Sequence, residues 1–324
     1  MRKEILNLLA SRPGEFISGE AISRHLNITR AGVWKQIQSL KESGFEIESQ
    51  TKSGYRLLKT PLSIEEWVLE QGLNTKTLGR KIKCFEELTS TNNYAKELLH
   101  QGDADGTVIL AKRQTAGRGR MQRAFASPAG GIWMTVVLKP RLSLTDASKL
   151  TLSTGVALAQ ACRRLYGLEV QIKWPNDLVY QGEKIAGILG EVVGEWNAVQ
   201  TMILGVGINA NLERKDLPSD FSATTLKELL GQPIDLNKLV IAFLEELETE
   251  VDSLEKGDSE GLRSRWMSYA AGIGKKVQIE RAGELYTGIL KGISVNGELI
   301  LEENNQERLF TSGDVKLRST EGYI

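Results

Sequence analysis

The first 60 residues alternate apolar and polar positions in a pattern that predicts three short helices and a β-hairpin. Apolar residues recur at helical spacing in 5–9, 22–26 and 33–40, whereas 45–57 alternates about a turn at 51–54. Thr29 is placed to N-cap the third helix. Two helices joined by a three-residue turn and followed by a hairpin are typical of a winged helix-turn-helix, whose second helix enters the major groove. The alternative is a small helical cap without a DNA role.

The chain from residue 61 to 270 changes to a mixed pattern. Residues 61–80 read as a linker with a short helix at 64–71. Apolar runs then predict strands at 82–85, 107–112, 132–138, 170–174, 186–193 and 201–208, and helices at 92–101, 151–166 and 237–254. Since several strands are joined by tight loops rather than helical crossovers, we expect a mixed α/β domain over 81–270 and no doubly wound sheet.

The helix at 151–166 is expected to bury one face. Leu152, Val156, Ala159 and Leu165 fall on that face, so Cys162 is interpreted as an inert core residue.

Residues 271–324 consist of short strands separated by turn residues. Asn296-Gly297 between apolar runs is a strong hairpin signal. About 50 residues of this texture predict a small C-terminal β-barrel. The expected architecture is therefore an α+β multidomain chain. It has a winged helix-turn-helix at 1–60, a linker at 61–80, a mixed α/β domain at 81–270 and a small β-barrel at 271–324.

Composition narrows the class of protein. The 324 residues are 41% hydrophobic and 25% charged, which is ordinary globular composition for two or three domains. The absence of a signal-peptide pattern and of a long apolar stretch predicts a cytoplasmic protein without a membrane segment. With two cysteines 78 positions apart and two histidines, neither a disulfide framework nor a Cys/His metal site is expected.

The zero net charge hides two basic zones. Residues 1–60 hold ten Lys and Arg against six Asp and Glu, and no acid occurs in 21–41. A surface facing phosphates would have this bias, and the residues expected to contact DNA are Arg24, Thr29, Arg30, Lys35 and Lys52. Residues 106–145 contain seven cations and no carboxylate. The two zones suggest two kinds of anionic partner, although a solvated basic loop explains the second equally well.

The most distinctive stretch is Gln114-Thr-Ala-Gly-Arg-Gly-Arg-Met-Gln-Arg123. It is neither a Walker A loop nor a dinucleotide fingerprint. Gly117 and Gly119 would let the backbone approach a ligand, and the arginines between and beyond them offer forks for phosphate or carboxylate oxygens. The stretch from Lys112 to Arg123, together with Lys184, is expected to offer cations to anionic groups without a competing acid.

A second cluster is Lys173-Trp-Pro-Asn-Asp177, in which Pro175 is expected to leave Asn176 and Asp177 at a strand end. Lys184 then precedes the strand Ile-Ala-Gly-Ile-Leu, which makes it a candidate anion contact. Gly205-Val-Gly-Ile-Asn209 ends a further strand and is a weak signal alone.

Taken together, these motifs and the Ser90-Thr91-Asn92 triplet resemble biotin protein ligases, and the N-terminal helix-turn-helix resembles the bifunctional subgroup that also represses biotin operons. The resemblance covers nearly the whole chain. It implies a central domain of the class II synthetase and biotin/lipoate ligase type and a C-terminal SH3-like barrel. In the loop at 117–125 this sequence departs from the family pattern at two positions, with Gln122 in place of a glycine and Phe125 in place of a tryptophan.

The resemblance also implies residue roles. The implied biotin-binding residues are Ser90, Thr91, Asn92, Gln114, Arg118, Gly119, Arg120 and Lys184. The implied nucleotide-binding residues are Lys173, Asn176, Asp177, Asn209 and Arg123. Lys184, Arg118 and Arg120 would act in catalysis. Ser90 has a second interpretation, because it is equally well placed to N-cap the helix that follows.

The implied activity is formation of biotinyl-5′-adenylate from biotin and ATP with Mg²⁺, without a metal site of the protein's own, followed by transfer to a lysine of the biotin carboxyl carrier of acetyl-CoA carboxylase. The adenylate-bound homodimer would repress biotin genes at a palindromic operator. Two alternatives stay open, a non-catalytic ligand-responsive repressor and a lipoate protein ligase.

Overall fold

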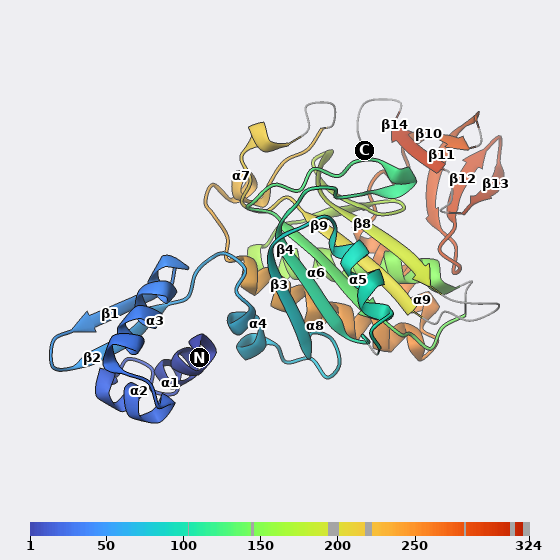
Figure 1. Ribbon diagram of the computed structural model, residues 1–324. Helices are drawn as coiled ribbons and strands as arrows, with labels where there is room; N and C mark the ends of the chain where they lie inside the picture. The colour runs from blue at the N-terminus through green and yellow to red at the C-terminus, as the bar shows by residue number, and fades with distance from the viewer. Residues whose placement is uncertain are drawn as a thin grey trace. The chain divides into compact units, whose positions relative to one another are not determined.

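A computed structural model describes residues 1–102, 104–143, 146–193, 201–217, 222–281, 283–311 and 315–319, apart from the side chains of Ala147 and 315–319. The chain divides into two compact units (Figure 1). The first comprises Met1–Gln71 with Asp235–Asn237, and the second comprises Gly72–Ile234 with Lys238–Ile324. No helix among the described residues is long and apolar enough to cross a membrane.

The first unit has the predicted order of three helices and a hairpin. Its elements are α1 (Arg2–Ala10), α2 (Gly19–Leu26), α3 (Arg30–Glu42), β1 (Glu46–Gln50) and β2 (Gly54–Lys59). The Ser18 hydroxyl accepts a hydrogen bond from Ala21 N at 3.0 Å, and Thr29 Oγ1 accepts one from Gly32 N at 3.1 Å. Each cap satisfies one free N–H group in the first turn of its helix. The expected winged helix-turn-helix is therefore formed.

The short helix α4 (Glu66–Gly72) begins within the first unit rather than in an independent linker. The Trp67 side chain is buried with the helices' core, its ring lies edge-on to Phe45, and its Nε1 donates to Asn7 Oδ1 at 2.6 Å. The compact unit thus extends beyond the expected boundary at residue 60, because a large aromatic side chain completes its core.

The second unit is built on a seven-stranded sheet in the order β3-β4-β5-β9-β8-β7-β6. Its strands are β3 (Lys81–Leu88), β4 (Thr107–Gln114), β5 (Ile132–Leu138), β6 (Gln171–Lys173), β7 (Asp177–Tyr180), β8 (Glu183–Val193) and β9 (Thr201–Ile208). Only the β3–β4 pair is parallel among the described strands. The sheet is therefore mixed and not doubly wound, as expected.

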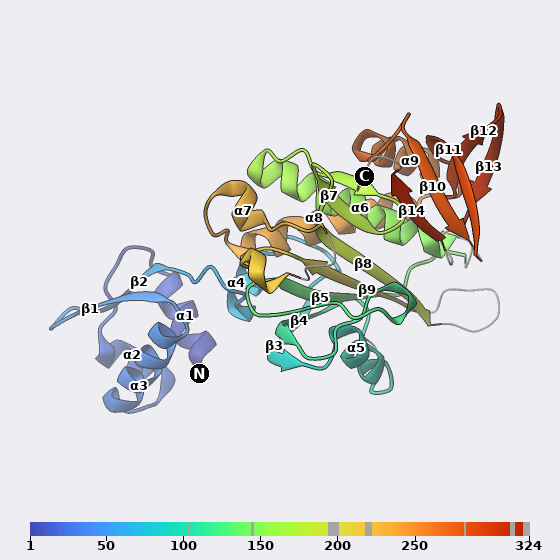
Figure 2. The ribbon, with the colours of Figure 1, turned by 90° about the horizontal axis from the view of Figure 1, so that it is seen from above.

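Helices cover both faces of this sheet (Figure 2). α5 (Thr91–Leu99) packs against β4, β5 and β9, and α6 (Ala147–Tyr166) packs against β6, β7 and β8. α8 (Leu236–Glu255) lies on the side of α6. Leu165 was expected in the buried face of α6, but its side chain is 36% exposed, because it lies in the last turn of the helix. Cys162 is buried, and burial raises the pKa of its thiol to about 12, which leaves it inert.

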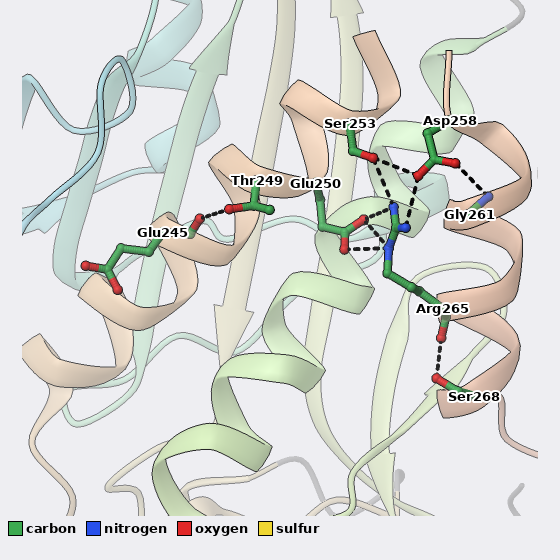
Figure 3. Close-up of polar contacts among 8 residues, drawn as sticks. All are labelled: Glu245, Thr249, Glu250, Ser253, Asp258, Gly261, Arg265 and Ser268. Carbon is green, nitrogen blue, oxygen red and sulfur yellow. Dashed lines mark hydrogen bonds and ion pairs between the residues drawn. The ribbon is translucent and has the colours of Figure 1, made fainter. Parts of the chain in front are cut away.

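A polar network joins α8 to α9 (Ser259–Tyr269) (Figure 3). The buried Glu250 carboxylate accepts from Arg265 Nε at 2.9 Å and from Arg265 Nη2 at 3.0 Å. Arg265 Nη1 also contacts Asp258 Oδ2 at 3.1 Å. Burial raises the pKa of Glu250 and the arginine opposes this rise, so the pair anchors α9 rather than offering a reactive acid.

The C-terminal residues form the expected small β domain, a five-stranded antiparallel sheet in the order β13-β12-β11-β10-β14. Its strands are β10 (Lys276–Arg281), β11 (Glu284–Ile293), β12 (Leu299–Glu303), β13 (Gln306–Phe310) and β14 (Val315–Ser319). Gly297 supplies the predicted turn with φ +82°. Trp174 Nε1 donates to Gly297 O at 3.2 Å, which joins this turn to the end of β6.

Candidate functional site

One face of the central sheet is bare of side chains at three glycines, which we call the glycine floor: Gly187, Gly205 and Gly207. Gly187 on β8 pairs with Gly207 on β9, two positions from Gly205 on the same side of the strand. A Cβ at Gly205 would stand 2.5 Å from Asn92 Oδ1, and one at Gly207 would stand 2.5 Å from the Phe125 ring. Only glycine leaves room for these two side chains above the strand.

A buried hydrogen-bond network, which we call the head network, lies at the Gly205 end of the floor. Thr135 Oγ1, fully buried on β5, lies 2.8 Å from Thr91 Oγ1 and 2.6 Å from Asn92 Oδ1. Asn92 Nδ2 donates to Glu191 Oε2 at 2.7 Å. Gln114 Oε1 accepts from Thr91 N at 2.8 Å. The network thus brings together three of the predicted biotin-binding residues, Thr91, Asn92 and Gln114.

Ser90, at the start of α5, is 5% exposed, and its hydroxyl accepts from Asn93 N at 3.4 Å. The capping interpretation is therefore confirmed. Its role toward a ligand stays a prediction.

The arginine loop, residues 117–125, forms a small hairpin beside the floor. Phe125 N donates to Gly117 O at 2.9 Å, and Gly119 N donates to Arg123 O at 2.8 Å. Gln122 has φ +57°, in the left-handed region. A glycine adopts this backbone without strain, so the departure at residue 122 places a strained residue at the loop tip. Arg118 Nη1 donates to Gln122 Oε1 at 3.2 Å, and Arg123 is exposed.

Phe125, at the position of the second departure, covers the Lys184 end of the floor. Its ring is edge-on to Trp133, with centroids 5.9 Å apart, and Lys184 Nζ lies 5.6 Å from its centroid. Trp133 is 1% exposed, and its Nε1 donates to Pro128 O at 2.8 Å. An apolar wall thus separates the head network from the cations.

The cations at this end converge from two motifs. Lys184 Nζ contacts Asp177 Oδ1 at 2.6 Å, with both side chains about one fifth exposed at 24% and 19%. Arg120 Nη1 donates to Asn176 Oδ1 at 3.2 Å, which joins the arginine loop to the turn after β6. These contacts bring four of the predicted catalytic and nucleotide-binding residues to one place.

Two further predicted nucleotide-binding residues are buried. Asn209 Nδ2 donates to Lys184 O at 3.3 Å and to Thr224 O at 3.2 Å, so its side chain fixes the backbone under Lys184. Lys173 is 7% exposed, directly before the turn that carries Asn176 and Asp177. Their expected contacts with nucleotide stay predictions.

The expectation that the basic stretch meets no competing acid is wrong. Lys112 Nζ pairs with Glu86 Oε1 at 2.8 Å, and Arg113 pairs with Glu87. Both glutamates come from β3, the parallel neighbour of β4, and Lys184 itself pairs with Asp177. Acids outside the basic stretch therefore pair with these cations, and Lys112 and Arg113 have partners on β3.

In the first unit, too, an acid outside the basic stretch pairs with its cations. Arg24 and Arg30 are 81% and 70% exposed, and both pair with Glu20, just outside the acid-free stretch. Lys35 is exposed on α3, and Lys52 lies at the tip of the hairpin with φ +69°. Thr29 is engaged as an N-cap. The five expected DNA contacts lie on α2, at the N-cap of α3, on α3 and on the hairpin, and their roles stay predictions.

Sequence reasoning missed Thr135 and Glu191. Thr135 lies inside an apolar strand, and Glu191 lies 99 positions from Asn92. A polar residue within a strand that is otherwise apolar was the only signal for Thr135. No pattern along the chain pointed to Glu191.

Comparisons with known proteins agree with these features. Residues 84–209 match the model of the biotin/lipoate A/B protein ligase family, residues 2–56 match an HTH domain, and residues 272–318 match a biotin protein ligase C-terminal domain. The bifunctional ligase/repressor BirA of Bacillus subtilis is 35% identical over 98% of each chain. The Escherichia coli protein of the same description is 30% identical over 98% of this chain and 97% of its own.

A solved structure is also similar. The biotin protein ligase from Aquifex aeolicus in complex with biotin and ATP has 26% identity and a TM-score of 0.66, and the match covers 74% of this chain and all of that one.

Proposed function

The chain belongs to the family of bifunctional biotin protein ligases with an N-terminal helix-turn-helix, and we propose that it activates biotin with ATP, biotinylates a carrier protein and represses transcription. One arrangement supports the ligase half most directly. The glycine floor has a hydrogen-bonding network at one end and cations at the other. Biotin has the matching form, because it carries a cyclic urea at one end and a carboxylate at the other.

A ligand that lies along the floor requires the Phe125 ring to move off Gly207. Gly205 and Gly207 are two residues apart on β9, which is about 7 Å along a strand. In this proposal the urea contacts Ser90, Thr91, Asn92 and Gln114, and the apolar part of biotin lies between them and Lys184. The backbone and side chains of the arginine loop, Gly119 with Arg118 and Arg120, close over the ligand.

The first step joins two anions. A biotin carboxylate oxygen attacks the α-phosphorus of ATP, a P–O bond forms, the bond to the bridging oxygen breaks, and pyrophosphate leaves. Lys184, Arg118 and Arg120 neutralise charge that grows at the reacting oxygens. Lys173, Asn176, Asp177, Asn209 and Arg123 hold the nucleotide side. In this proposal Lys184 exchanges its contact with Asp177 for the ligand carboxylate, so the ammonium keeps an anionic partner when the ligand binds.

The second step transfers biotin to the carrier. A deprotonated lysine amine of the carrier attacks the acyl carbon, a C–N bond forms, AMP leaves, and the amine loses a proton. Curated relatives described as biotin–[acetyl-CoA-carboxylase] ligases, such as that of Mycobacterium tuberculosis, make the carrier domain of this carboxylase the proposed partner.

Mg²⁺ enters the proposal only with the nucleotide. Among the described residues, no group of three or more His, Cys, Asp or Glu side chains could hold a metal ion. Mg²⁺ commonly keeps its waters and binds substrate phosphates, where it neutralises charge. We therefore assign it no step and no protein ligand set.

The repressor half rests on the first unit. One helix-turn-helix reads a short half-site, so selective binding requires two copies on a symmetric operator. We propose that the adenylate favours a homodimer that places both recognition helices on palindromic DNA, in the cytoplasm. Arg24, Thr29, Arg30, Lys35 and Lys52 are the proposed contacts.

Two assays test the proposal. Incubation with biotin, ATP and the unmodified carrier domain should add the mass of biotin to one carrier lysine, and no added mass would overturn the ligase half. A gel shift on a palindromic promoter fragment should show tighter binding with biotin and ATP than without them. Equal affinity in both conditions would overturn the proposed switch while leaving the ligase half untouched.

A further inference from the structure

The head network has one hydrogen fewer than its oxygen-to-oxygen contacts require. Three oxygen-to-oxygen contacts run in series, from Asn92 Oδ1 to Thr135 at 2.6 Å, from Thr135 to Thr91 at 2.8 Å, and from Thr91 to Gln114 Oε1 at 3.1 Å. Each hydroxyl supplies one hydrogen, and amide oxygens supply none. Two hydroxyl hydrogens therefore serve three contacts, so one of the contacts joins two acceptor oxygens with no hydrogen between them.

The orientation of Gln114 cannot supply the missing hydrogen. Its Oε1 accepts from Thr91 N at 2.8 Å, and its Nε2 donates to Ser127 Oγ at 2.9 Å. Ser127 Oγ in turn lies 2.9 Å from Phe125 O, which can only accept. Turning the Gln114 amide would set its NH₂ against the Thr91 N–H, two donors face to face. The oxygen of Gln114 thus stays directed at Thr91.

Asn92 could supply the hydrogen if its amide turned over. Its Nδ2 would then donate to Thr135, Thr135 to Thr91, and Thr91 to Gln114, so that every contact held a hydrogen. Glu191 opposes this arrangement. Its Oε2 accepts from Asn92 Nδ2 at 2.7 Å, and in the turned amide two acceptor oxygens would face each other there.

Glu191 is itself fixed from the other side. Lys96 Nζ pairs with Glu191 Oε1 at 2.6 Å, at exposed fractions of 43% and 30%. The carboxylate can therefore serve as an acceptor for both neighbours, and it has no hydrogen to offer Asn92.

We propose that Glu191 is a positioning residue that holds the Asn92 amide in the orientation that leaves the head network one hydrogen short, so that the site favours a head group bringing an N–H donor. This inference rests on the proposed function and deepens it. The cyclic urea of biotin has two N–H groups, whereas the dithiolane ring of lipoate has none. The residue would thereby act on the choice between the two ligand classes that the matched family model names together.

The test compares Glu191→Gln with a matched control, Lys96→Met. The amide introduced by Glu191→Gln can donate to a turned Asn92, which completes the network without ligand, while Lys96→Met removes the ion pair and keeps the carboxylate. In biotin-dependent pyrophosphate release, Glu191→Gln should raise the biotin KM about tenfold and leave the ATP KM within about twofold. Lys96→Met should leave the biotin KM within about threefold of wild type.

A swapped pair distinguishes hydrogen direction from loss of packing. When Asn92→Asp is combined with Glu191→Gln, the introduced amide donates to the introduced carboxylate. That carboxylate again only accepts from Thr135, so the shortage returns. The biotin KM of the double variant should be lower than that of Glu191→Gln by at least about threefold. Should Glu191→Gln fail to fold in a thermal melt, the double variant is compared directly with wild type, and a rise in its biotin KM above about tenfold counts against the inference.

Three results would overturn it: an unchanged biotin KM in Glu191→Gln, an equal loss in Lys96→Met, or no recovery in the swapped pair. Failure of the proposed function looks different, because wild type would then release no biotin-dependent pyrophosphate at all.

Discussion

The two ends of the glycine floor use polar side chains in opposite ways. At the head network, Thr135 is fully buried and its hydroxyl contacts both Thr91 and Asn92, so these side chains are held in place before a ligand arrives. At the other end, Lys184 and Arg120 are partly exposed and hold Asp177 and Asn176 through contacts that a ligand anion can replace. Buried hydrogen bonds select the ligand because leaving them unmade is costly, whereas at the other end a ligand anion can take the place of the present partners of the cations.

The largest effect is expected at the exchangeable end. Lys184→Ala removes the cation proposed to lie closest to the reacting carboxylate and should lower adenylation at least about 100-fold. Lys112→Ala is the matched control, because Lys112 pairs with Glu86 outside the site, and it should keep near wild-type activity. Steady-state pyrophosphate release measures both. Near wild-type pyrophosphate release by Lys184→Ala would contradict the proposed role of this lysine.

At the fixed end, Thr135→Val should weaken biotin binding and the fold together. The isosteric valine leaves Asn92 Oδ1 and Thr91 Oγ1 without their shared partner, at a cost of about 1–3 kcal/mol. Urea denaturation should show this loss of unfolding free energy, and the biotin KM should rise about tenfold. Thr135→Ser keeps the hydroxyl and serves as the control. A loss in the serine variant as large as in the valine variant would show that packing, not hydrogen bonding, fixes this end.

The arginine loop should affect retention more than selection. Arg118→Gly removes an exposed guanidinium from the loop hairpin, so the closed loop should hold the adenylate less firmly. Released adenylate would label lysines of a bystander protein, detected by a blot for biotin. Bystander labelling no stronger than with wild type would mean that the loop surrounds the site without retaining the intermediate.

The smallest effect is expected in the first unit, where the exposed pairs face the proposed DNA. Glu20→Gln frees Arg24 and Arg30 and removes a negative charge, so operator affinity should rise about threefold at low salt. Glu48→Gln, which releases Arg56 in the hairpin, is the control and should change affinity less. Fluorescence anisotropy with labelled DNA measures both. Weaker binding in Glu20→Gln would show that the pairs position the arginines rather than mask them.

Periodicity along the chain predicted most elements of the fold. The helices with clear apolar faces, the alternating hairpin and the Asn296-Gly297 turn all form where expected. Among the described residues, the sequence did not predict β7, α7 (Leu226–Leu230) and α9, and β7 and α7 are too short for a periodic signal. Leu165 was misplaced because periodicity does not say where a helix leaves the core.

The site was predicted only where its residues lie in local motifs. Gln114, Lys184 and the turn at Asn176 stood out because glycine, proline or clustered charge marked them. Sequence reasoning assigned no role to Thr135 and Glu191, which contact the start of α5. It also did not predict that Glu86 and Glu87 pair with cations on the neighbouring strand. These contacts join residues that are distant in the sequence and become neighbours only when the sheet forms. The acid-free stretch 21–41 was likewise a poor guide to the surroundings of its cations, because Glu20, one position before it, pairs with Arg24 and Arg30.

The central claim is that the two ends of the floor bind one molecule and join it to a nucleotide. The most direct measurement is pyrophosphate release from ATP by the full-length chain without carrier, with biotin or lipoate as the only added acid. The account predicts release with biotin and none above background with lipoate, and a bound biotinyl-adenylate mass in the recovered protein. Release with lipoate but not biotin, or with neither, would contradict it.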